Sequence, residues 1–123
     1  MKFKTYKSDL ALMLNAMFNT DQSCFSYGTI EGVFMEKPDV FEILVIENKR
    51  PHNGHFQKFM TFITDYCKRE DKKLAFLEIF NKGLYNKLVS EGFRPYKGTG
   101  LIKEFTPAFL FGAEGARSNR AGG

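Results

Sequence analysis

The stretch that decides the fold is VFEILVIE at residues 40–47, followed by NKRPHNGH at residues 48–55. The first segment is nearly continuous in apolar residues, which is typical of a strand buried on both faces of a sheet. A second apolar run, LAFLEIF, occupies residues 74–80. The helix predicted between them carries, at helical spacing, Phe56, Phe59, Met60, Ile63, Tyr66 and Cys67. Since a helix separates the two strands, we expect them to be parallel and joined by a right-handed crossover.

Upstream of this unit, the pattern predicts a strand, a helix and a second strand. Residues 2–6 alternate between polar and apolar side chains, and Ser8 can cap the helix that follows. That helix is amphipathic and ends near Asn19. Its apolar residues at helical spacing are Leu10, Met13, Leu14, Met17 and Phe18. We interpret residues 19–26 as a polar loop and residues 27–35 as a strand.

Downstream, Asn81 can cap a short helix that Gly92 ends. Residues 93–97 and 101–105 then resemble a hairpin around a glycine-containing turn. The predicted fold class is therefore α/β (α+β), with a mixed central sheet, flanking helices and the order β-α-β-β-α-β-α-β-β.

The length of 123 residues fits one domain, which we assign to residues 1–106. Residues 107–123 form a C-terminal tail, whose last part is rich in glycine, alanine, serine and arginine. Such a composition is typical of a mobile terminus. Alternatively, the tail serves as an interaction arm that a protein partner holds in place.

Composition and charge exclude several classes of protein. The formal net charge is +4, but the lysines are scattered, which argues against a nucleic-acid-binding protein. Cys24 and Cys67 lack metal-binding spacing and indicate reduced thiols inside a cell, with no metal. The N-terminus has no signal-peptide pattern, and no apolar run is long enough to cross a bilayer. We therefore expect a cytosolic protein that does not enter a membrane.

The loop and helix after the first buried strand carry the chemistry. A helix N-terminus offers unpaired N–H groups and a partial positive charge, which together bind phosphates. Lys49, Arg50 and Lys58 add basic charge beside this N-terminus. The pattern therefore suits a pyrophosphate, although the same residues are equally consistent with a solvated basic loop.

At this point the sequence resembles the GNAT superfamily of N-acetyltransferases. In that family, a Q/R-x-x-G-x-G/A loop between a strand and a helix cradles the pyrophosphate of acetyl-CoA. Residues 51–56 read PHNGHF here, and Gly54 matches the first glycine. Asn81 and the pair Gly92-Phe93 match the family's asparagine and the Gly-Phe that ends its next helix. The resemblance covers residues 41–105. The sequence is also similar to short GNAT-like proteins encoded by tailed phages.

The resemblance implies an acetyl-CoA-dependent N-acyltransferase that transfers an acetyl group directly to an amine. It would work in the cytoplasm of a host or belong to a phage particle. The cofactor-binding residues that it implies are Ile46, Glu47, Lys49, Arg50, His52, Asn53, Gly54, His55, Phe56 and Asn81. The acceptor amine is not defined by the sequence, and a homo-oligomer is left open.

The candidate catalytic residues are Glu47, Glu78 and Tyr85. Glu47 ends the first buried strand and is the first choice for the general base, with Glu78 second. Leu88 stands where many family members have a tyrosine that protonates the departing thiolate. Tyr85 lies one helical turn earlier and substitutes only if the helix is shifted. Both glutamates are also consistent with surface carboxylates, and Asn81 with a plain helix cap.

Two residues depart from the family pattern. Pro51 stands where glutamine or arginine is usual, and Phe56 replaces the second small residue of the loop. A large side chain there restricts the approach of a phosphate to the backbone. The alternative hypothesis is therefore a catalytically inactive GNAT-fold structural or adaptor protein, of a phage particle, which binds partners through its tail. A third hypothesis is a small inhibitor that binds a host protein.

Overall fold

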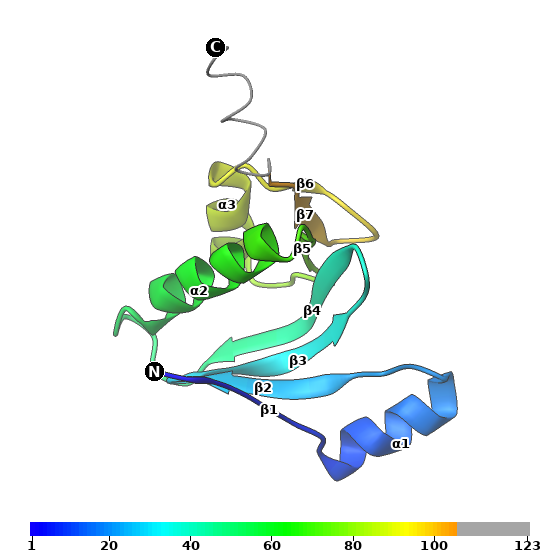
Figure 1. The fold of residues 1–123 in the computed structure, drawn as a ribbon. Helices are drawn as coiled ribbons and strands as arrows, with labels where there is room; N and C mark the ends of the chain where they lie inside the picture. The colour runs from blue at the N-terminus through cyan, green and yellow to red at the C-terminus, as the bar shows by residue number, and fades with distance from the viewer. Residues whose placement is uncertain (106–123) are drawn as a thin grey trace.

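The computed structural model describes residues 1–105, and the predicted tail at residues 107–123 lies outside this range. The described residues form seven strands and three helices (Figure 1). Their bounds are β1 Phe3–Tyr6, α1 Asp9–Phe18, β2 Ser23–Tyr27, β3 Ile30–Glu36, β4 Val40–Asn48, α2 His55–Arg69, β5 Lys73–Phe76, α3 Lys82–Ser90, β6 Arg94–Pro95 and β7 Leu101–Lys103. The protein thus has the mixed α/β class that its sequence predicts.

The seven strands form one sheet with the order β1-β2-β3-β4-β5-β7-β6. Neighbours are antiparallel throughout, except that β4 and β5 run parallel. These two strands are connected by α2, and their parallel pairing confirms the prediction from the apolar runs. Figure 1 shows α2 and α3 on one side of the sheet and α1 on the other.

The predicted element order lacks one strand and is corrected here. Residues 23–27, interpreted as a loop, form β2 and pair with both β1 and β3. Gly28 has φ 60° and makes the tight turn into β3, so the strand predicted over residues 27–35 is the second arm of a hairpin. The serines on either side of Cys24-Phe25 gave this strand the polar character of a loop, although Phe25 is fully buried.

The first helix is confirmed, but its amphipathic spacing does not mark a buried stripe. As predicted, Ser8 Oγ accepts a hydrogen bond from the Ala11 N–H at 3.0 Å and the helix ends at Asn19. Asn19 adopts the left-handed conformation. Ala11 is the buried residue of this helix, whereas most of its large apolar side chains are exposed to solvent.

The core lies between α2 and the sheet face that it covers, and it is rich in aromatic rings. Phe25 stacks on Phe59 with ring centroids 5.3 Å apart, and Phe34 stacks on Phe41 at 4.8 Å. Cys67 is fully buried beside them, and burial raises the pKa of its thiol to about 12. This cysteine therefore behaves as a small apolar residue, as the sequence suggests.

The third helix begins and ends as its sequence predicts. Asn81 Oδ1 accepts a hydrogen bond from the Leu84 N–H at 2.9 Å, which is an N-cap contact. Gly92 follows the last turn with φ 97°, a left-handed conformation that glycine adopts without steric cost. Leu88 packs in the core from this helix and is fully buried.

A small polar cluster joins the end of α2 to the end of β3. The Tyr66 hydroxyl donates a hydrogen bond to Glu36, and Lys72 Nζ lies 2.7 Å from the same carboxylate. Burial alone would raise the pKa of Glu36, but the hydrogen bonds from Lys72 and Tyr66 outweigh it and lower that pKa. The hydrogen bond to Glu36 and burial raise the pKa of Tyr66 to about 12.

We predict that Tyr66→Phe destabilises the protein most between pH 4.5 and 10, the ordinary pKa values of the two groups. As the pH falls below 4.5, protonation of Glu36 removes the stabilisation that its hydrogen bond with Tyr66 contributes, because the pKa of Glu36 is lowered in the folded protein. Above pH 10, the contribution falls towards pH 12, because the unfolded tyrosine ionises before the folded one. Urea unfolding of wild type and variant across pH measures the difference. Tyr6→Phe, at an exposed residue of β1, should change stability by an amount that does not depend on pH in this way.

Candidate functional site

The parallel strands β4 and β5 separate partway along their length. Four residue pairs join them, the last being Ile43 with Phe76, where β5 ends. One further backbone hydrogen bond runs from the Leu77 N–H to the Ile43 carbonyl at 2.8 Å. Beyond it, β4 continues to Asn48 while the other segment turns towards α3.

The strand predicted over residues 74–80 is therefore too long. Glu78 has φ 48°, a left-handed conformation that an extended strand does not contain. The backbone turns away at this residue and leaves a cavity of about 310 Å³ between the two segments. We call this cavity the β4–β5 cleft; residues 43–46, residues 76–81 and Leu84 line it.

A bulge in β4 coincides with the opening of the β4–β5 cleft. Across β3, Phe34 faces Ile43 and Val33 faces Val45, so Leu44 is an extra residue in β4. A bulge bends its strand and increases the local twist. It therefore turns the second half of β4 away from β5, which opens the β4–β5 cleft.

A second cavity, of about 430 Å³, adjoins the β4–β5 cleft at the end of β4. The two cavities share Ile46, Asn81 and Leu84. The other lining residues of the second cavity are Asn48, Pro51, His52, Phe56, Gly83 and Lys87. We call it the loop cavity, and together the two cavities lead from the divergence of β4 and β5 to the N-terminus of α2.

The N-terminus of α2 presents unpaired backbone donors. Gly54 caps it with φ 82° and no side-chain hydrogen bond, and Asn53 Oδ1 accepts the His55 N–H at 3.0 Å. The helical ladder begins with the Lys58 N–H bonded to the Gly54 carbonyl. The N–H groups of residues 56–57 therefore precede the ladder and, with the helix dipole, can hold an anion.

A polar network fixes this loop to the turn between β2 and β3. His55 Nδ1 accepts the Thr29 N–H at 3.1 Å. Thr29 Oγ1 donates to Asn48 Oδ1 at 2.9 Å and accepts from Asn53 Nδ2 at 3.0 Å. The side chains of Asn53 and His55, predicted to bind a cofactor, are thus engaged in holding the loop. Thr29 is absent from the sequence prediction because only the hairpin brings it here.

The basic residues near the loop differ in whether they line the loop cavity. Lys49 Nζ lies 3.3 Å from Glu31 Oε1 on β3, and Lys49 does not line the loop cavity. Arg50 is exposed to solvent, whereas His52 lines the loop cavity. Lys87 lines that cavity too and was not predicted, although it lies one helical turn after Gly83 and Leu84, on the same face of α3.

The three catalytic candidates lie in different surroundings. Glu47 is exposed and opposite Glu31, and it lines neither cavity, because it alternates with Ile46 along β4. Glu78 is the ionisable residue among those lining the β4–β5 cleft. Tyr85 is half-buried against the core and lines neither cavity. Of the three, the geometry favours Glu78.

Glu42 was not predicted as a site residue, because it is one polar residue within an apolar run. It is a buried carboxylate beside the point where β4 and β5 diverge. It is 1% exposed, and it lies on the sheet face away from α2. Its Oε1 is 3.1 Å from Lys37 Nζ, and its Oε2 accepts the Tyr96 hydroxyl at 3.1 Å. Burial and this hydrogen bond raise the pKa of Tyr96.

Compared with known proteins, the sequence matches no family model and no curated protein. Among residues 1–105, no helix has the length and apolar character needed to span a membrane. In the same part of the chain, no group of three or more histidine, cysteine, aspartate or glutamate side chains is arranged to bind a metal ion. The functional assignment therefore depends on the geometry of the two cavities.

Proposed function

We propose that the chain is an acyl-CoA-dependent N-acyltransferase of the GNAT type. The observation that carries the proposal is the divergence of parallel β4 and β5 at a bulge, next to an open helix N-terminus. The positions of Asn81 and Gly92, at the two ends of α3, support it. Acyl-CoA consists of a thioester, a long arm and a pyrophosphate. A molecule of this kind suits a path that leads from a strand edge to a helix N-terminus.

The lining residues fit such a cofactor by their chemistry. The N–H groups of residues 56–57 would hold the pyrophosphate, with His52 and Lys87 lining the same cavity. A Cβ atom added at Gly54 would meet nothing within 4 Å, so this end of the loop is open to a ligand. Ile46 and Leu84 offer apolar walls for the pantetheine arm, and they line both cavities.

The proposed reaction needs little from the protein beyond positioning and a proton acceptor. Bound acetyl-CoA supplies an activated acyl carbon. The amine nitrogen would bond to that carbon as the carbon–sulfur bond breaks, CoA would leave as its thiolate, and the nitrogen would lose a proton. Glu78 in the β4–β5 cleft is the candidate to accept this proton.

Calorimetric titration of the full-length protein with acetyl-CoA tests the proposal. We expect saturable binding of about micromolar affinity. Glu78→Gln should retain that binding and lower turnover of a responsive amine by about 10²–10⁴-fold, the usual contribution of a general base. Glu47→Gln is the matched variant, because Glu47 is exposed and lines neither cavity. Absence of saturation at millimolar acetyl-CoA would contradict the proposal.

One observation favours a second function, that of a binding protein that keeps this fold without catalysis. The Phe56 side chain lines the loop cavity at the helix N-terminus, where a small residue would leave more room for a phosphate. If the titration shows no binding in the wild type but binding in Phe56→Ala, the aromatic side chain closes the site. The adaptor function would then be supported.

A further inference from the structure

Helix α1 carries an apolar surface that the rest of the described chain leaves uncovered. We call it the α1 surface, and its residues, each 53% to 64% exposed, are Leu10, Leu12, Met13, Met17 and Phe18. After Asp9, the helix contains no charged residue. A helix that is apolar on nearly all sides is normally buried within a protein or an assembly. The α1 surface is therefore unusual for a helix facing water.

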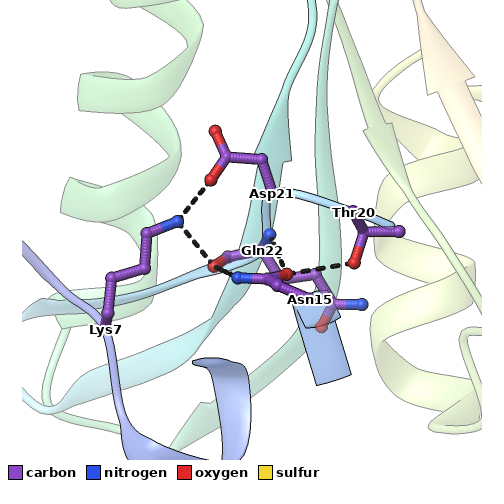
Figure 2. A network of polar contacts seen from close by, with 5 residues as sticks. All are labelled: Lys7, Asn15, Thr20, Asp21 and Gln22. Carbon is purple, nitrogen blue, oxygen red and sulfur yellow. Dashed lines mark hydrogen bonds and ion pairs between the residues drawn. The ribbon is translucent and has the colours of Figure 1, made fainter. Parts of the chain in front are cut away.

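A polar network holds α1 in this orientation (Figure 2). Asn15 Oδ1 accepts the Gln22 N–H at 2.6 Å and the Thr20 hydroxyl at 3.0 Å. Lys7 Nζ donates to the Gln22 carbonyl at 2.9 Å and to Asp21 Oδ1 at 2.5 Å. Turning the helix to bury its apolar side chains would break the contacts of Asn15. The α1 surface is thus presented by an anchored helix.

The position of α1 leaves room for another molecule. Cys24 Sγ lies 3.5 Å from Ser8 Oγ, so the helix begins over the sheet face that carries Cys24. Figure 1 shows α2 and α3 on the opposite face. Tyr6, which is 50% exposed, pairs with Cys24 across the antiparallel strands and so lies on the same sheet face. No other described helix covers this side of the sheet.

We propose that two copies of this chain associate through the α1 surface, helix against helix, about a twofold axis. A twofold axis brings the same patch of both copies together, so the patch must complement itself. The residues of the α1 surface meet this condition because none of them is charged, and Asp9, in the first turn, is the one charged residue of the helix. At its border, Lys7 and Asp21 already neutralise each other. Interfaces between identical copies are also the most apolar class.

The composition of α1 argues against a lipid surface as the occupant. Helices that lie in the headgroup region carry lysine or arginine on their polar face. Residues 9–18 contain neither. The dimer also does not depend on the proposed acyltransferase activity, because the α1 surface shares no residue with the β4–β5 cleft or the loop cavity.

Sedimentation velocity of the full-length protein, over a range of concentrations, tests the dimer. We expect a monomer–dimer equilibrium in the wild type. Met13→Glu should weaken it by about a hundredfold or more, because each copy would bury an unpaired carboxylate. The matched control is Val89→Glu on α3, an apolar residue 46% exposed on the other side of the sheet, which should leave the dimer intact.

Disulfide trapping tests the helix-to-helix geometry separately. Cys24 and Cys67 are both buried, so an exposed cysteine in Met13→Cys would be the accessible thiol of the described residues. Mild oxidation should link two copies of this variant and not two copies of Val89→Cys. A wild type that stays monomeric at about 100-micromolar concentration, well above the dissociation constants of ordinary interfaces, would overturn the proposal. So would a dimer that Met13→Glu leaves unchanged, or binding of the monomer to anionic vesicles through α1.

Discussion

Phe59→Ala is expected to lower the free energy of unfolding by about 3–5 kcal/mol, the usual cost of truncating a buried phenylalanine. Phe59 is fully buried on α2. Its ring stacks on Phe25 with an interplanar angle of 7° and meets the edge of Tyr27 at 5.9 Å. Its removal leaves a cavity between α2 and the sheet that neighbouring rings cannot fill without losing their own contacts.

The loss is a large part of the roughly 5–15 kcal/mol that stabilises a domain of ordinary size. Urea unfolding monitored by circular dichroism measures it, provided that the denaturant slope stays unchanged. Phe80→Ala is the matched control, because this phenylalanine is 81% exposed and loses the same atoms. It should change stability by no more than about 0.5 kcal/mol, as surface substitutions usually do. Similar losses in both variants would contradict the described core.

The parts of the fold that the sequence predicts are those specified by local chemistry. The parallel unit of β4, α2 and β5 follows from two apolar runs around a helical pattern. The caps at Ser8, Asn81 and Gly92 follow from hydrogen bonding and from the freedom of glycine at positive φ. Each of these features depends on a few neighbouring residues, so a single sequence suffices to predict them.

Other features depend on contacts between distant segments. β2 has the composition of a loop and becomes a strand because β1 and β3 pair with its two edges. The apolar spacing of α1 predicts a helix but does not say whether the apolar side chains meet the sheet or another molecule. Glu78 looks like a residue inside a strand, and its left-handed φ appears only in the folded chain.

The candidate site divides in the same way. An anion site at the N-terminus of α2 was predicted from the loop sequence, whereas Gly54, Ile46 and Asn81 were implied as cofactor-binding residues by the resemblance to the GNAT superfamily. The bulge at Leu44 has no sequence signal, because an extra apolar residue in an apolar run changes no pattern. Glu47 follows that bulge and lines neither cavity, whereas Glu78 lines the β4–β5 cleft. Strand-end position therefore favoured Glu47, whereas the geometry favours Glu78.

Leu84→Glu is expected to weaken acetyl-CoA binding by about a hundredfold, which corresponds to about 2.7 kcal/mol. Leu84 is half-buried and lines both the β4–β5 cleft and the loop cavity, so any ligand that passes between them contacts it. The substitution removes an apolar contact worth about 1.5–3 kcal/mol when fully buried. It also places a negative charge beside an anionic cofactor, which adds repulsion.

This loss should not arise from unfolding. Asn81 caps α3 through the backbone N–H of residue 84, which the substitution leaves in place. A glutamate three residues after a helix cap is also favourable, since it can return a hydrogen bond to the capping residue. Val89→Glu adds the same charge to the same helix at a residue that lines neither cavity. Leu84 also packs against the core, so Leu84→Glu should lower the melting temperature, and both variants are titrated well below their melting temperatures. Calorimetry under these conditions should separate the two variants. If acetyl-CoA binds Leu84→Glu and the wild type equally well, the ligand binds outside the path between the two cavities.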